Sequence, residues 1–458
     1  MPLSSVDPAS GRLLARYDPH GAAELEQRLA LAEAAFADWR HASAERRRAG
    51  LERAARGFDE RRRELARLAT REMGKTLAAA EAEVAKCARV LAWYADNAER
   101  LLAPVEVATD AERSYVRFDP LGPVLAVMPW NFPFWQVVRF AAPALACGNV
   151  ALLKHASNVT GCALALEEVF AGAGFPEGCF QALLVGSEAV AGLIRDPRVA
   201  AVTLTGSEPA GAAVGAAAGG ALKKVVLELG GSDPFLVLPS ADVARAAAVA
   251  VRARTINNGQ SCIAAKRFIV HEAVYDEFER HFVATHAALR VGDPMDPATE
   301  VGPLATAAIR DELDSQVRAT VAAGGRLLAG GTPLPGPGFF YAPTAIADPP
   351  SASPAAREEL FGPVAALFRV ASFEAALELA NATSFGLGAA IWTRDPAEAE
   401  RAAAGLEAGS VFVNAMVASD PRLPFGGVKR SGHGRELAGW GLHEFVNVKT
   451  VWISGGRV

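Results

Sequence analysis

Cysteine is scarce in this chain of 458 residues, which contains only five. No two of the five have the spacing of a zinc site or of a Cys-x-x-Cys redox pair, and their odd number does not suit a complete disulfide framework. They are Cys87, Cys147, Cys162, Cys179 and Cys262. The sequence therefore indicates reduced thiols, no metal site and a cytoplasmic protein.

Long apolar runs and a strong excess of one charge are also missing. The N-terminal twenty residues contain no apolar signal core, and the longest apolar stretch, "FAAPALACGNVALL", is short and interrupted by Pro143 and Gly148. The formal net charge is −5, which gives no electrostatic reason to bind nucleic acid or an anionic membrane. We therefore expect neither as a partner.

Lysine is rare as well, because only eight of the 46 basic residues are Lys. In a chain that uses Arg as its general surface cation, each lysine is more informative than usual. The run "ERRRAGLERAARGFDERRRELARLATREMGK" interleaves its bases with Glu and Asp at helical spacing. That pattern predicts a solvated amphipathic helix and not a nucleic-acid surface.

The order of elements predicts the fold class. Residues 21–103 repeat Ala, Leu, Arg and Glu at periods of three and four, which is typical of helices. Short apolar strands then alternate with helices as far as "KKVVLELGG", and again from "DPFLVL" to "GSVFVNA". This pattern predicts an α/β protein with parallel sheets covered on both faces. The terminal strand "NVKTVWI" lies apart from both blocks, which favours an intersubunit role.

Cys262 has small neighbours in "NNGQSCIAAKR", residues 257–267. A structural cysteine more often has bulky apolar neighbours, whereas a reactive thiol needs room for a substrate. Gly259 allows the backbone to come close. The small residues around Cys262 therefore favour a reactive thiol at this position.

Two segments could bind negative charge. In "MPWNFPFWQ", Asn131 precedes Pro133, where a helix could begin. The side-chain amide of Asn131 could donate a hydrogen bond to a developing oxyanion, or it could simply cap the helix. In "LTGSEPAG" a buried strand leads to Gly206, Ser207 and Gly211, a turn that could hold phosphate at a helix N-terminus. Each signal is weak by itself.

Two further segments contain carboxylates. Glu228 in "VVLELGG" lies among apolar strand residues, so its pKa should be raised, which suits a general base; a satisfied structural carboxyl is the alternative. Glu359 and Phe361 lie in "REELFGPV", a loop that Gly and Pro end.

Taken in order, these motifs resemble those of the aldehyde dehydrogenase superfamily over essentially the whole chain. They are "PWNFP", "LLKHAS", "TGS", "LELGG", "GQSC", "EELFGPV" and "PFGGVKRSGHGRE". The resemblance implies a Rossmann-like parallel-sheet cofactor domain, an α/β catalytic domain and a small oligomerisation sheet. The expected ranges are 1–106 and 126–230 for the cofactor domain, 231–420 for the catalytic domain, 421–445 for a return segment, and 107–125 with 446–458 for oligomerisation strands.

The resemblance also implies catalytic and cofactor-binding roles for individual residues. Cys262 would attack the aldehyde, Asn131 and the Cys262 N–H would hold the oxyanion, and Glu228 would activate the water that cleaves the thioester. Glu359 would hold the nicotinamide ribose, with Phe361 beside the ring. The full set of expected cofactor contacts is Trp130, Lys154, Ser157, Gly206, Ser207, Gly211, Leu229, Glu359 and Phe361.

Within the superfamily the chain is most similar to the short succinate-semialdehyde dehydrogenases. If a helix begins at Pro133, Trp135 and Arg139 share a face, and Arg139 could meet a distal carboxylate with help from Ser419. Arg139 in an ordinary ion pair, with Arg422 as the carboxylate ligand, is the alternative. A different or broad aldehyde specificity, a CoA-acylating enzyme and a non-enzymatic structural protein are the other functions to weigh. An intact Glu228 argues against the CoA-acylating enzyme, and the presence of Cys262, Glu228 and Asn131 together argues against a structural protein.

Ser157 predicts the cofactor. Members that favour NAD commonly have Glu three residues after the lysine of "KHAS", and here that position is Ser157. A carboxylate there would repel the 2′-phosphate of NADP, while Ser157 donates a hydrogen bond and Lys154 offers a cation. We expect NADP to be preferred and NAD to be a weaker substitute, although a neutral Ser157 would give dual use. The resemblance also implies a homodimer or homotetramer.

Overall fold

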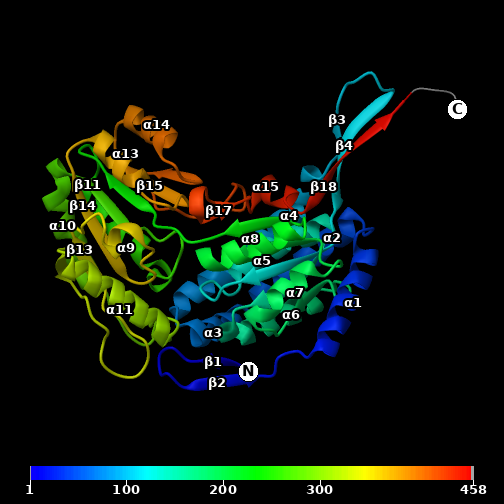
Figure 1. The fold of residues 1–458 in the computed structure, drawn as a ribbon, viewed down its shortest axis with the longest axis horizontal. Coiled ribbons are helices and arrows are strands. Elements are labelled where there is room, and N and C mark those ends of the chain that lie inside the picture. The colour runs from blue at the N-terminus through cyan, green and yellow to red at the C-terminus, as the bar shows by residue number, and fades with distance from the viewer. Residues whose placement is uncertain (1, 455–458) are drawn as a thin grey trace.

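Two open sheets and one small sheet organise the chain in this computed structural model, which describes residues 2–454 (Figure 1). The N-terminal half forms one lobe and the segment from β10 to β16 forms the other, while β3, β4 and β18 project from the body as an arm. The predicted α/β class with parallel sheets is confirmed. No helix among residues 2–454 combines the length and apolarity of a transmembrane span.

The first lobe contains a six-stranded sheet in the order β17-β9-β8-β5-β6-β7. All its pairs are parallel except that of β17 with β9. Its strands are β5 (Pro123–Met128), β6 (Val150–His155), β7 (Phe180–Ala182), β8 (Ala201–Thr205), β9 (Lys224–Glu228) and β17 (Gly432–His433). Every residue of β8 is buried, as expected for a parallel strand covered on both faces.

Helices cover this sheet on both faces. They are α1 (Ala22–Trp39), α2 (Ala44–Glu60), α3 (Arg62–Met73), α4 (Leu77–Leu101), α5 (Trp135–Cys147), α6 (Thr160–Gly172), α7 (Val190–Arg195) and α8 (Glu208–Gly220). The short turns η1 (Ser157–Val159) and η2 (Ser187–Ala189) precede α6 and α7, and a hairpin of β1 (Leu3–Val6) and β2 (Leu13–Tyr17) begins the chain. One continuous apolar core joins these helices to the sheet.

The second lobe contains a seven-stranded sheet in the order β12-β13-β14-β11-β10-β15-β16, parallel except at β12. Its strands are β10 (Pro234–Val237), β11 (Arg267–His271), β12 (Arg326–Ala329), β13 (Thr344–Ala347), β14 (Val364–Val370), β15 (Gly388–Trp392) and β16 (Ser410–Val413). Its helices are α9 (Val243–Thr255), η3 (Ile256–Gly259), α10 (Glu272–Ala287), α11 (Ala307–Ala322), α12 (Pro354–Arg357), α13 (Phe373–Asn381) and α14 (Pro396–Gly405). Alternate residues of β10 enter two separate cores, one on each face.

The arm is an antiparallel sheet of β3 (Val105–Glu106), β4 (Arg113–Pro120) and β18 (Val446–Ile453). It exposes Val448 and Trp452 to solvent at 59% and 54%. Between β16 and β18 the chain returns across the first lobe through η4 (Lys429–Ser431), β17 and α15 (Ala438–His443) (Figure 1). The expected terminal strand is therefore present, and residues 455–458 of the expected range 446–458 lie outside the described residues.

Helix α5 begins at Trp135, two residues after the predicted start at Pro133. A carboxylate from another helix caps this start, because Glu83 Oε1 on α4 accepts hydrogen bonds from the backbone N–H groups of Phe134 and Trp135, both at 2.9 Å. These N–H groups would otherwise be unpaired at the helix start. Sequence reasoning missed Glu83 because its partner lies far along the chain.

Candidate active site

A tight backbone turn presents Cys262. Asn257, Asn258 and Gly259 are consecutive residues with φ of 56°, 59° and 76°. A Cβ added to Gly259 would lie 2.3 Å from the carbonyl carbon of Gly362, so only glycine fits. Left-handed backbone at two non-glycine residues is costly and often marks a functional segment.

The Cys262 thiol differs from the other four. Cys262 is half-buried, whereas the remaining cysteines are buried. Burial, followed by the nearby Glu359 carboxyl, raises the pKa of the Cys262 thiol to about 12, while Arg139 and Lys266 oppose the rise. The thiol is therefore protonated at neutral pH in this structure and has to lose a proton before it can act as a nucleophile.

Asn131 lies between β5 and α5 and is joined to the loop that precedes Cys262. Its Nδ2 donates to the carbonyl of Gln260 at 3.0 Å, and Asn257 Nδ2 donates to the carbonyl of Asn131 at 2.7 Å. An amide nitrogen carries two hydrogens, so one donor remains for another acceptor. The predicted oxyanion donor and the predicted nucleophile therefore belong to one hydrogen-bonded unit.

A buried ion pair supports this unit from α4. Lys75 and Glu83 are in contact, and their side chains are 0% and 1% exposed. Lys75 Nζ also lies 4.2 Å from the centre of the Phe132 ring. Because Glu83 caps α5, the pair positions the loop that carries Asn131. The rarity of lysine was the only sequence signal for Lys75.

Glu228 ends β9 and is 2% exposed. Burial, with a further contribution from Glu436, raises the pKa of the Glu228 carboxyl well above its usual value. The Gly-Gly turn that follows approaches Cys262, since a Cβ added to Gly231 would lie 2.7 Å from the Cys262 carbonyl oxygen. The expected raised pKa is confirmed, and a raised pKa suits a carboxyl that acts as a general base.

A pocket of about 500 Å³ opens beside Cys262. The predicted residues that line it are Trp130, Asn131, Gly206, Ser207, Leu229, Cys262, Glu359 and Phe361. Residues of α11, among them Ile309 and Leu313, form another part of its wall. We call this space the Cys262 pocket. Its lining does not include the predicted residues Lys154, Ser157, Gly211, Glu228, Trp135, Arg139 and Ser419.

The wall formed by α8 fits a dinucleotide. Ser207 precedes α8 and makes no capping bond with its side chain, so the helix N-terminus offers free donors to the pocket. A Cβ added to Gly211 would lie 2.4 Å from Leu229 Cδ2, so glycine lets α8 pack closely on Leu229. A helix N-terminus with free N–H groups at the end of a parallel strand is suited to a pyrophosphate.

Glu359 and Phe361 complete the lining opposite the Gly-Gly turn. Glu359 Oε1 accepts a hydrogen bond from the Gly231 N–H at 3.1 Å and lies 3.4 Å from Lys266 Nζ. Phe361 meets Trp130 edge to face, with ring centres 5.7 Å apart. A carboxylate beside an aromatic pair matches the recognition of a ribose and a ring expected of these residues.

Lys154 and Ser157 lie away from the thiol, at the carboxyl end of β6. Lys154 is half-buried and Ser157, the first residue of η1, is exposed. Burial lowers the pKa of the Lys154 ammonium, against the effect of Glu188. Ligands of parallel sheets bind at the carboxyl ends of strands, so these residues could reach the far end of a cofactor that enters the pocket.

Arg139 lies on α5 and is 3% exposed. Its guanidinium forms a buried ion pair with Glu436 and lies 4.6 Å from the centre of the Phe425 ring. The ion pair is the alternative that the sequence left open, and a substrate contact by Arg139 stays a prediction. Arg422 pairs with Asp420 at 2.7 Å on an exposed loop.

Replacing Arg139 with Ala should destabilise the protein. Glu436 would stay buried without its partner, and breaking a buried pair in this way costs about 3–5 kcal/mol. Thermal unfolding of Arg139→Ala should show a clearly lowered midpoint, and Arg139→Ala combined with Glu436→Gln should recover part of the loss. An unchanged midpoint in the single variant would show that the pair does not stabilise the fold.

Lys86 is a residue near the predicted substrate contacts that sequence reasoning missed. Its Nζ donates to Ser419 Oγ at 2.5 Å and lies 4.1 Å from the centre of the Trp135 ring. Trp135 and Ser419 are thus brought together through a lysine on α4. The scarcity of lysine was a general signal, but nothing in the sequence singled out Lys86.

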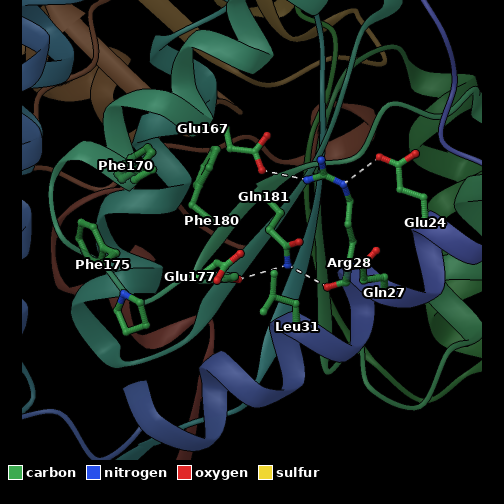
Figure 2. Close-up of a pocket in the computed structure, with 13 residues that line it drawn as sticks. Glu24, Gln27, Arg28, Leu31, Glu167, Phe170, Phe175, Glu177, Phe180 and Gln181 are labelled. Carbon is green, nitrogen blue, oxygen red and sulfur yellow. Dashed lines mark hydrogen bonds and ion pairs between the residues drawn. The ribbon is translucent and has the colours of Figure 1, made fainter.

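A second hollow, of about 420 Å³, lies between α1 and α6 (Figure 2). Arg28 Nη1 is 2.9 Å from Glu167 Oε1, and its Nε is 3.7 Å from Glu24 Oε1. Arg28 is thus paired within the hollow, whose lining also includes Glu177. None of the predicted site residues, all of which lie within residues 2–454, lines it. The Cys262 pocket is the better candidate site.

The sequence and the fold are similar to those of known proteins. The model of the aldehyde dehydrogenase family matches residues 2–451. The NADP(+) succinate-semialdehyde dehydrogenase of Mycobacterium avium is 55% identical, covering 100% of this chain and 98% of its own. Form 1 of that enzyme in Mycobacterium tuberculosis strain H37Rv is also 55% identical, over 99% of this chain and 100% of its own. The crystal structure of succinic semialdehyde dehydrogenase from Streptococcus pyogenes with NADP+ superposes with a TM-score of 0.97 at 36% identity, over 99% of this chain and 100% of that one.

Proposed function

The chain belongs to the aldehyde dehydrogenase family, and from this premise we propose that it oxidises succinate semialdehyde to succinate with NADP as the preferred cofactor and NAD as a weaker one. One observation carries the proposal: Cys262, Asn131 and Glu359 line the same pocket as the N-terminus of α8. The names of the relatives, at 55% identity over almost the whole chain, support the substrate and the cofactor.

The chain's own residues account for the chemistry in two stages. Cys262 Sγ, once deprotonated, bonds to the aldehyde carbon, and the resulting oxyanion accepts hydrogen bonds from the Asn131 amide and the Cys262 N–H. NADP, when bound, supplies the hydride acceptor. Glu228 then takes a proton from water as that water attacks the Cys262 thioester, which releases the acid and restores the thiol.

Different residues would contact different parts of the cofactor and the substrate. Ser207 and the N-terminus of α8 would hold the pyrophosphate, with Gly206 and Leu229 beside it, while Gly211 lets α8 pack closely on Leu229. Glu359 would take the nicotinamide ribose, with Phe361 and Trp130 beside the ring. Lys154 and Ser157 would contact the adenosine end. Trp135, Arg139 and Ser419 would surround the distal part of the substrate.

A panel of aldehydes tested with both cofactors is the direct test. Succinate semialdehyde should give the highest kcat/KM, uncharged aldehydes such as butanal much lower values, and the product should be succinate. A clear preference for an uncharged, amino or aromatic aldehyde would contradict the substrate. A CoA-acylating activity is the second candidate for this pocket, and it would appear as a requirement for CoA; Glu228, the group proposed to activate water, argues against it.

The Ser157→Glu variant should reverse the cofactor preference. A carboxylate at this exposed position would meet the 2′-phosphate of NADP, and the repulsion in a partly dry cleft should lower kcat/KM with NADP about ten- to a hundredfold. Initial rates with each cofactor at saturating aldehyde measure the change, and Ser157→Ala serves as the control that removes only the hydroxyl. If wild-type protein used NAD well and NADP hardly at all, the proposed preference would be wrong.

The arm supports an assembly of two or four copies. Val448 and Trp452 of β18, with Val105 of β3, are exposed apolar side chains on a strand pair that extends from the body. A second copy that covered them would remove this apolar surface from water and pair a free strand edge. Five free cysteines favour a reducing compartment, so we place the enzyme in the cytoplasm.

A further inference from the structure

Lys86 is the one feature near the predicted substrate contacts to which the mechanism assigns no role. It lies on α4, three residues after Glu83, and it is half-buried. Its ammonium contacts a hydroxyl from the segment after β16 and an indole at the start of α5, namely Ser419 and Trp135. Side chains from three separate segments of the chain therefore meet at one buried cation.

Within the protein the Lys86 ammonium has a hydroxyl and an aromatic ring as neighbours, those of Ser419 and Trp135. Among residues 2–454 it forms no ion pair with a carboxylate, in contrast to Lys75 and Lys266, which pair with Glu83 and Glu359. Its neighbour Arg139 is already paired with Glu436. A partly desolvated cation without an anion is unfavourable unless a ligand supplies the anion.

Lys86 lies against the start of α5, which forms part of the wall of the Cys262 pocket. Its ammonium contacts the Trp135 ring, and the next residue, Gln136, lines the pocket. Trp135, which Lys86 contacts, lies four residues after Asn131, and Asn131 is hydrogen-bonded to the loop of Cys262. The two terminal carbons of succinate semialdehyde are joined by three carbon–carbon bonds and lie about 4 Å apart. A substrate held at Cys262 and directed to the α5 wall of the pocket, which Gln136 lines, would point toward the side where Lys86 lies.

We infer that Lys86 is a specificity-determining residue that binds the distal carboxylate of the substrate, with Ser419 as a second donor and Trp135 against the methylene groups. This inference rests on the proposed function. Lysine provides a compact ammonium with three donors, so it can hold Ser419 and a carboxylate together. The charge of Arg139 would add to the field at the carboxylate, while its ion pair with Glu436 holds it in place.

A distinctive pH dependence should accompany this role. Burial, followed by the charge of Arg139, lowers the pKa of Lys86 to about 8. The other charged or titratable groups that act on Lys86 are Cys87, Arg89 and Glu83 on its own helix, while Asp420 beside Ser419 has its own pKa lowered by Lys86. Because only the protonated ammonium attracts a carboxylate, selectivity for the charged aldehyde should be high below pH 8 and fall as the pH rises through 8.

The experiment compares kcat/KM for succinate semialdehyde with kcat/KM for butanal in four proteins: wild type, Lys86→Met, Lys86→Arg and Arg89→Met. Met is unbranched and close in length to the apolar stem of Lys, but it lacks the ammonium with its charge and its three donors. We expect the ratio of the two values to fall about ten- to a hundredfold in Lys86→Met and to recover at least partly in Lys86→Arg. Arg89→Met removes a neighbouring exposed cation and should change the ratio less than about twofold.

The ratio measured between pH 6.5 and 9.5 gives the second readout. It should fall near pH 8 in wild type and stay level in Lys86→Arg, while effects of Cys262 ionisation cancel because both aldehydes need the same thiol. Turnover of butanal by Lys86→Met shows that the variant is folded. A wild-type enzyme that favours succinate semialdehyde while Lys86→Met keeps the same ratio would overturn the inference alone. A wild-type enzyme without that preference would overturn the proposed function.

Discussion

Replacing Cys262 with Ala should reduce kcat for aldehyde oxidation by about 10⁴-fold or more, because no other group in the Cys262 pocket can form the covalent bond to the aldehyde. Cys262 is the one cysteine among residues 2–454 that is not buried, so another thiol cannot take its place. Formation of reduced cofactor, followed by absorbance, measures the loss. Unfolding midpoints close to wild type would exclude a folding defect.

The matched control is Cys179→Ala. It also removes a thiol, but from a buried position next to β7 and outside the pocket. This variant should keep most of the activity and lose only some stability. Activity of Cys262→Ala above about one per cent of wild type would remove Cys262 from the role of nucleophile.

Replacing Glu228 with Gln should separate the two halves of the reaction. Gln keeps the size of the side chain but cannot accept a proton, so acyl transfer to Cys262 should proceed while hydrolysis slows by about 10²- to 10⁴-fold. Rapid mixing should show a burst of about one reduced cofactor per subunit, followed by a slow steady state. Intact-protein mass spectrometry should detect the acylated enzyme.

The raised pKa of Glu228 adds a pH signature in the wild-type enzyme. A carboxyl with a raised pKa is protonated below that value and cannot act as a base, so the steady-state rate should fall on the acid side well above the usual range of a glutamate. The Glu228→Gln variant should lose this acid limb. Steady-state turnover close to wild type in that variant would assign the base to another group.

The sequence was informative wherever the signal is local. Cys262 with its small neighbours, the turn at Gly206 and Ser207, and the strand that ends at Glu228 are each contained in a segment of a few residues. Short apolar strands between helices predicted the α/β class for the same reason, since periodicity and turn residues act over short distances. The structure brings these segments to one pocket, as the order of motifs implied.

Side-chain contacts between distant segments of the chain could not be predicted from the sequence. The start of α5 is capped by Glu83, which lies 51 residues before Phe134. Arg139 was expected to face a substrate, yet a carboxylate from the return segment, Glu436, pairs with it. Lys86 reaches Ser419 across 333 residues. Local spacing contains no information about such partners, because tertiary packing alone decides which side chains meet.

Helix α4 has a consequence for the size of molecule that the enzyme accepts. Glu83 fixes the loop of the oxyanion donor, and Lys86, three residues later on the same helix, would hold the far end of the substrate. Each helical residue adds 1.5 Å along the axis, so three residues span about 4.5 Å, close to the length of a four-carbon chain. This fixed spacing on one rigid helix would thus select substrates by the distance between their carbonyl and their carboxylate. A semialdehyde one methylene longer or shorter would place its carboxylate or its carbonyl out of register.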